Sequence, residues 1–227
     1  MPSATHGITP GTALGMAIDA SGKRIRISST HFTDIDGGEQ KSKRSSATQV
    51  FIPQARAKRS TADFFEFVAY CIREYIHTQG LVESKGNVAL IPLGVSIGLP
   101  VSRQNGQPLG QDMCSPLSCT VAEVSKEDSL DLGDRDVARH LYDAILRNHL
   151  PVRIASVTNN VVSSLVAAQF NNKTTRVAAS FNHGINAAYI KRHPDNQNSD
   201  DRLVAVNTEI GRFGSAPESL AVLPMTL

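Results

Sequence analysis

An apolar run over residues 88–99 constrains the fold of this chain more than any other feature. It predicts a central strand buried in a sheet. Before it, apolar residues within 60–79 recur at three- and four-residue steps, which predicts a helix. Ser60 is expected to cap the start of this helix, and Gly80 to end it. A second helix is expected over 134–148. Helices alternating with a buried strand indicate the α/β class.

The other expected elements lie on either side of this central part. The early strands are expected over residues 13–19, 23–29 and 48–52, with a turn at 20–22 and a polar loop at 33–46. The later elements are expected as a strand over 152–157, a helix to Ala168 capped by Asn159, and strands over 176–181, 184–191 and 203–207. The order is therefore three strands, helix, strand, helix, strand, helix and three strands.

The bulk composition excludes several kinds of partner. The 227 residues are 41% hydrophobic, which is enough for a core, and a formal net charge of +2 favours no charged partner. With aromatic residues at only 5%, we expect no nucleic-acid partner. No run reaches transmembrane length and residues 1–12 lack a signal-peptide core, so we expect a cytoplasmic protein without a membrane partner. The three cysteines have no metal-ligand spacing, so no metal is expected.

Three pieces of the second half carry the strongest functional signal. Residues 156–163 read S-V-T-N-N-V-V-S, residues 180–189 read S-F-N-H-G-I-N-A-A-Y, and residues 206–214 read V-N-T-E-I-G-R-F-G. In this order they resemble the hexokinase family, whose members read roughly V-V-N-D-T-V-G, then G-T-G-T-N-A-x-Y, then V-N-T-E-W-G-A-F-G. Residues 64–72 and 93–100 are similar to two further family segments, so the resemblance extends from about Gly15 to Gly214.

The resemblance implies an α/β chain with one complete actin-like, ribonuclease H-like half, followed by the opening β-meander of the second half. We expect residues 1–170 to form a unit like the hexokinase small domain. Residues 171–227 are expected to pack on it as a truncated remnant of the large domain, in a family about twice as long. Strands without their covering helices would expose an apolar face, which predicts a homodimer.

The residues that the family uses for phosphoryl transfer are altered. Asn160 stands where the resemblance places the catalytic aspartate, and an amide cannot accept a proton as a carboxylate does. The two expected phosphate loops read D-A-S-G-K-R at 19–24 and N-H-G-I at 182–185, in place of D-L-G-G-T-N and G-T-G-T. Missing glycines prevent a close backbone approach to phosphate. We therefore expect a degenerate ATP site, no competent kinase and no cofactor.

What remains is a set of polar residues that suit hydroxyl recognition. The expected ligand-binding residues are Asn159, Asn160, Asn186, Asn207, Gly98 and Asp112, and the expected catalytic residues are Glu209 and His183. Gly98 replaces a serine of the family's sugar pocket, and Asp112 lies on a remodelled loop. A carboxylate or an imidazole can move protons. The alternative is purely structural, with turn-forming asparagines, a surface glutamate and an exposed loop histidine.

Three functions are open at this point. The first is a pseudoenzyme or regulatory protein that binds a small molecule in the remnant sugar cleft. The second is an enzyme of another class that uses the remodelled cleft for a cyclisation, isomerisation or dehydration in specialised metabolism. Gly98, Pro116, Leu117 and Ile185 would make that cleft more apolar and suit a ligand less polar than a hexose. The third, an active hexose kinase, conflicts with Asn160.

Overall fold

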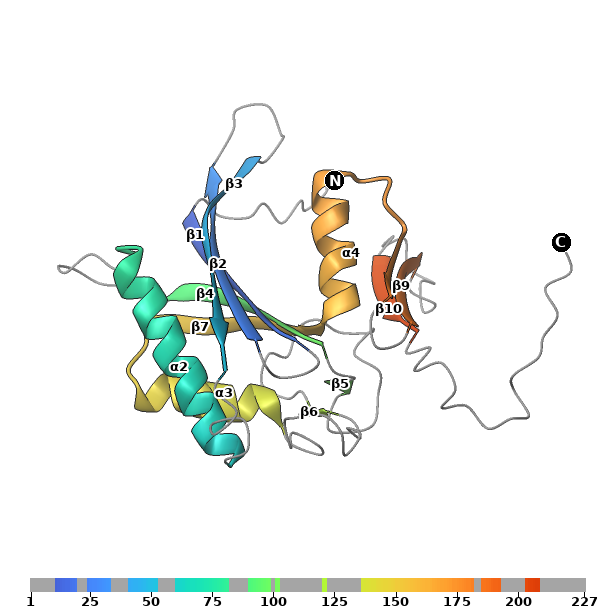
Figure 1. Ribbon diagram of the computed structural model, residues 1–227. Coiled ribbons are helices and arrows are strands. Elements are labelled where there is room, and N and C mark those ends of the chain that lie inside the picture. Colours follow the sequence, from blue (N-terminus) through green and yellow to red (C-terminus); the bar gives the residue numbers. More distant parts are fainter. Residues whose placement is uncertain are drawn as a thin grey trace, which may run out of the picture. The chain divides into compact units, whose positions relative to one another are not determined.

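The computed structural model describes residues 11–19, 24–33, 41–52, 60–81, 90–98, 101–102, 120–121, 136–181, 185–192 and 203–208. The described residues through Thr158 form one compact unit, and those from Asn159 onward form a second. Figure 1 labels the elements of both units. Among the described residues, no helix is both long enough and apolar enough to cross a membrane.

A mixed sheet forms the centre of the first unit. Its strands, in the order β3-β2-β1-β4-β7, are β3 (Lys41–Phe51), β2 (Arg24–Thr33), β1 (Gly11–Ile18), β4 (Ile91–Ile97) and β7 (Val152–Asn159). β2 runs antiparallel to both β1 and β3, whereas β4 runs parallel to β1. A parallel neighbour requires a crossover connection, and the helix between β3 and β4 supplies it. The expected α/β class is confirmed.

Alternate residues of these strands point into the core. Leu14 and Met16 of β1 are buried, as are Ile25 and Ile27 of β2 and Leu93 of β4. β4 is central, as expected, but its burial alternates between buried and half-buried positions. The half-buried positions hold proline, glycine and serine, which alternate with the aliphatic residues. None of the three is charged, so the sequence reads as one apolar run. One face of the sheet therefore holds the bulky side chains.

Two helices cover bulky side chains of the first unit. α2 (Thr61–Thr78) begins at Ser60, whose Oγ accepts a hydrogen bond from Asp63 N at 3.2 Å. Its stripe, including Phe64, is buried, and Tyr75 donates its hydroxyl to Ser29 Oγ at 3.0 Å across the buried interface with β2. α3 (Val137–Arg147) lies beside α2 (Figure 1). Both helices were predicted from their apolar periodicity.

The third strand differs from the sequence-based expectation. β3 begins at Lys41, inside the segment expected to be a polar loop, and its pairing with β2 is interrupted only by a bulge at Ser29 and Thr30. It is an edge strand whose first six residues are all polar, so they give no apolar alternation. Backbone pairing with β2 forms the strand in spite of this. The short pair β5 (Val101–Ser102) and β6 (Thr120–Val121) was also not predicted.

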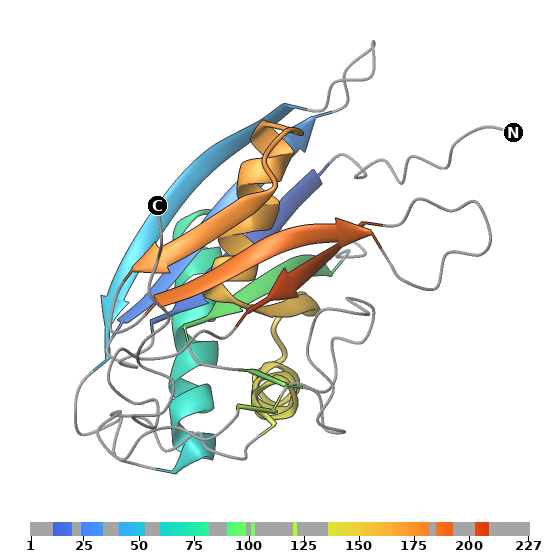
Figure 2. The same cartoon turned by 90° about the vertical axis from the view of Figure 1, so that its right-hand side faces the viewer.

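The second unit is a helix packed on a three-stranded sheet. α4 (Asn160–Asn171) contacts β8 (Val177–Phe181), β9 (Ile185–Arg192) and β10 (Leu203–Asn207), which form an antiparallel sheet in the order β10-β9-β8. Its small core joins Val161, Val162 and Leu165 of α4 to Ala188. Ala178, Ile190 and Ala205 pack against this core. Figure 2 shows α4 behind the three strands.

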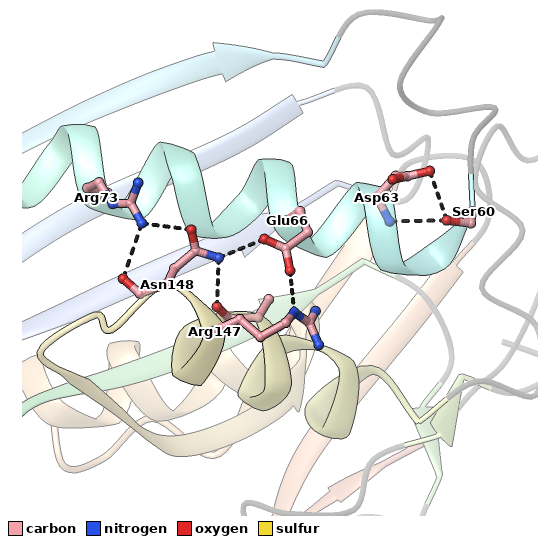
Figure 3. A network of polar contacts seen from close by, with 7 residues as sticks. Ser60, Asp63, Glu66, Arg73, Arg147 and Asn148 are labelled. Carbon is pink, nitrogen blue, oxygen red and sulfur yellow. Dashed lines mark hydrogen bonds and ion pairs between the residues drawn. The ribbon is translucent and has the colours of Figure 1, made fainter.

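A polar network joins α2 to α3 in the first unit (Figure 3). Glu66 of α2 accepts hydrogen bonds from Asn148 Nδ2 at 2.7 Å and from Arg147 Nε at 2.6 Å. Arg73, almost two turns further along α2, donates to Asn148 Oδ1 at 2.7 Å and to Asn148 O at 3.1 Å. The hydrogen bond from Asn148, together with Arg147 and Arg73, lowers the pKa of Glu66 below its ordinary 4.5, although burial opposes this shift.

We expect Glu66→Gln to lower the free energy of unfolding by about 0.5–1 kcal/mol at neutral pH, because the network is partly exposed and solvent screens it. The folded-state pKa lies below the unfolded one. The contribution of Glu66 is therefore fully present above pH 4.5 and is lost as the pH falls through the folded-state pKa. Urea unfolding of both proteins at falling pH measures the difference.

Glu74→Gln is the matched control, because Glu74 is exposed on the same helix. We expect it to leave the unfolding free energy within a few tenths of a kcal/mol of the unsubstituted protein. A Glu66→Gln protein as stable as this control would show that the network contributes nothing. The same conclusion would follow if the difference failed to shrink in acid.

Candidate functional site

Asn159 lies where a strand ends and a helix begins. It is the last residue of β7, only 4% exposed, and its extended backbone (φ −68°, ψ 152°) lets the side chain turn back onto the helix. Its Oδ1 accepts a hydrogen bond from Val161 N at 2.9 Å. This satisfies one of the N–H groups that every helix leaves unpaired at its start. The predicted capping role of Asn159 is confirmed.

Asn160 is the first residue of α4 and is half-buried. Its backbone carbonyl accepts a hydrogen bond from Ser164 Oγ at 2.9 Å. The first turn of α4 contains no acidic side chain, so no carboxylate offsets the positive end of the helix dipole there. The Asn160 side chain offers a hydrogen-bond donor and an acceptor, but it carries no charge.

Asn186 extends the polar contacts from α4 to the sheet. Its Nδ2 donates to Asn159 Oδ1 at 3.5 Å, which is the outer limit of a hydrogen bond. Its Oδ1 accepts from Ala187 N at 2.8 Å and lies 3.4 Å from Thr208 Oγ1. Thr208 in turn donates both its backbone N–H and its hydroxyl to Ala187 O, each at 2.9 Å. These contacts connect α4, β9 and the end of β10.

Asn207 lies on the same side of the sheet as Asn186. It pairs in register with Ala188, which is buried against α4, and neighbouring antiparallel partners share a face. Asn207 is half-buried. We call Asn159, Asn160, Asn186, Asn207 and Thr208 the asparagine cluster. The first four were predicted as site residues, and the second unit contains them all.

Thr208 was not predicted as a site residue. It belongs to the V-N-T-E piece, but its role depends on the position of Ala187 of the neighbouring strand, which is 21 residues away in the chain. Gly98 belongs to the first unit, where its N–H donates to Ile18 O at 2.9 Å. Glu209, His183 and Asp112 lie outside the described residues.

The asparagine cluster can recognise a ligand but cannot by itself move a proton. Amide and hydroxyl groups both donate and accept hydrogen bonds, which suits the hydroxyls of a small polar molecule. None of the five side chains titrates near neutral pH. In the part of the chain that the structure describes, no three His, Cys, Asp or Glu side chains come together as metal ligands.

Similar proteins are found along most of this chain. The family model described as hexokinase matches residues 1–170. Hexokinase-10 of Oryza sativa subsp. japonica is 29% identical over 168 residues, which is 71% of this chain and 30% of that protein. A glucokinase of Aspergillus niger is 27% identical over 257 aligned positions, covering 100% of this chain and 48% of that protein. The chain thus spans less than half the length of these relatives.

Solved structures agree with this assignment at the level of the fold. A hexokinase from Schistosoma mansoni in complex with glucose superposes with a TM-score of 0.65 at 20% identity. The superposition covers 90% of this chain and 42% of that one. A second hexokinase structure gives a TM-score of 0.53 at 16% identity. Since the family model spans most of the sequence and these folds agree, the chain belongs to the hexokinase family.

Proposed function

We propose that this hexokinase-family protein binds a small molecule through the asparagine cluster and does not transfer phosphoryl groups. The observation that carries the proposal is Asn160 as the first residue of α4. It directly follows the capping Asn159, at the position that the family resemblance gives to the catalytic aspartate. A general base must accept a proton from the attacking hydroxyl, and an amide nitrogen or oxygen does not do so near neutral pH.

The contacts of the asparagine cluster support the binding half of the proposal. Asn159 and Asn186 lie within hydrogen-bond reach of each other, and Ala187 N holds Asn186 Oδ1 with a hydrogen bond of 2.8 Å. Such preordered groups lose little entropy when they hydrogen-bond a ligand. The Schistosoma mansoni relative was solved with glucose, so a hexose is the first ligand to test. A ligand less polar than a hexose is the second, because Gly98 stands where the family resemblance places a serine of the sugar pocket.

Turnover is the first test. We expect the purified chain to release no ADP above background when hexose and magnesium-ATP are supplied together. Asn160→Asp is nearly isosteric and restores a carboxylate at the start of α4, where the helix dipole favours it. We expect this variant to remain inactive as well, because both phosphate loops are also altered. Hexose-dependent ADP release by the unsubstituted chain would contradict the proposal.

Binding is the second test. We expect calorimetric titration with glucose to give saturable heat, and Asn186→Ala to weaken that binding about tenfold or more, the equivalent of about 1.4 kcal/mol. Asn171→Ala is the matched control, since Asn171 is exposed near the end of α4, where its Nδ2 donates to Ala167 O at 3.2 Å. Thermal unfolding of each variant shows whether the second unit still folds.

The outcomes of the titration separate the remaining hypotheses. Equal glucose affinity in the Asn186→Ala and Asn171→Ala proteins would place any sugar site away from the asparagine cluster. No heat with glucose would direct the search to less polar metabolites. Turnover of such a metabolite would then favour the second hypothesis, an enzyme of another class.

A further inference from the structure

The sheet of the second unit has one face that α4 does not cover. Ala178, Ile190 and Ala205 pack against α4, so the alternate residues of the same strands point to the opposite side. We call this opposite side the outer face. Its described residues are Val177, Ala179, Phe181, Ile185, Ala187, Tyr189, Lys191 and Val206.

Three bulky side chains of the outer face are exposed, whereas Ile185 and Val206 are half-buried. Phe181 is 77% exposed, Val177 is 61% exposed and Tyr189 is 39% exposed. The register places Val177, Tyr189 and Val206 side by side across the three strands, and it pairs Phe181 with Ile185. They therefore form one continuous apolar surface, of the kind that marks an association site.

We propose that the outer face is a homodimer interface, in which a second copy of this chain packs its own outer face against the first. This inference goes beyond ligand binding and does not depend on it. Two identical sheets have the same twist, and sheets with the same twist pack face to face at a small angle. A two-fold axis then brings the same residues of both copies together.

The charge and composition of the face suit a second copy. Lys191 is the single charged side chain among the described outer-face residues, and it lies at one end, beyond Tyr189. A charged partner would find little to pair with here, whereas two such faces meet with little electrostatic repulsion. Phenylalanine and tyrosine are also typical of interface centres. The edge strands β8 and β10 have only five residues each, which offers little length for edge-to-edge pairing.

The size of the face sets the expected strength. The three strands have five, eight and five residues, and at about 4.8 Å between strands and about 3.3 Å per residue they cover on the order of 300 Å² for each copy. That is less than half of what a standard stable interface contributes from each side. The dimer is therefore reversible, and its population depends on protein concentration.

Sedimentation velocity over a wide range of protein concentration tests the proposal. We expect the mass to rise from the 24.4 kDa of one chain toward twice that value as the concentration increases. Phe181→Ser is expected to raise the dimer dissociation constant about tenfold or more. Phe51→Ser is the matched control, since Phe51 is 69% exposed at the end of an edge strand in the first unit. It is expected to leave the constant unchanged.

Three outcomes would overturn the proposal. One is a mass of a single chain at every concentration. Another is a dimer that Phe51→Ser weakens as much as Phe181→Ser does. The third comes from a chain that ends after Gly214: if this shortened chain dimerises and the full chain does not, residues 215–227 cover the face instead of a second copy.

Discussion

The second unit depends on one amide group, the side chain of Asn159. Its Oδ1 accepts a hydrogen bond from Val161 N in the first turn of α4. The same oxygen accepts a second, longer one from Asn186 Nδ2 of β9. The hydrogen bond from Val161 N sets where the helix begins, and the 3.5 Å contact with Asn186 brings β9 next to that point. The core of Val161, Val162, Leu165 and Ala188 then forms immediately next to this contact. The position of the candidate site follows from the same amide.

The replacement at Asn160 separates the fold of this family from its chemistry. Asparagine and aspartate have the same shape and both tolerate the start of a helix, so α4 forms at the same place with either one. The proton acceptor is what changes, because an amide lacks the basic oxygen of a carboxylate. A chain can therefore keep the hexokinase fold while its site becomes a set of neutral hydrogen-bonding groups. Function has to be argued from the site and not from the fold.

The two units differ in how their helices cover the sheets. In the first unit, α2 and α3 cover bulky side chains of the sheet and are joined by Glu66, Arg73, Arg147 and Asn148. In the second, α4 covers one side of three short strands, and among the described residues the other side shows Val177, Phe181 and Tyr189. A sheet that is covered by a helix on one side only leaves the apolar side chains of its other side exposed. The homodimer proposal follows from this asymmetry.

The sequence alone determined the α/β class, the positions of α2, α3 and α4, the central place of β4 and the cap at Asn159, because periodicity and capping act within a few residues. It also placed four asparagines of the candidate site, Asn159, Asn160, Asn186 and Asn207, in pieces that resemble the family. Only the tertiary structure decided that Lys41 begins β3, that Thr208 donates to Ala187, and that Glu66 accepts from Asn148. Each of these depends on a partner distant in the chain. Backbone pairing and side-chain contacts over such separations leave no periodic pattern in the sequence, so no local rule could reveal them.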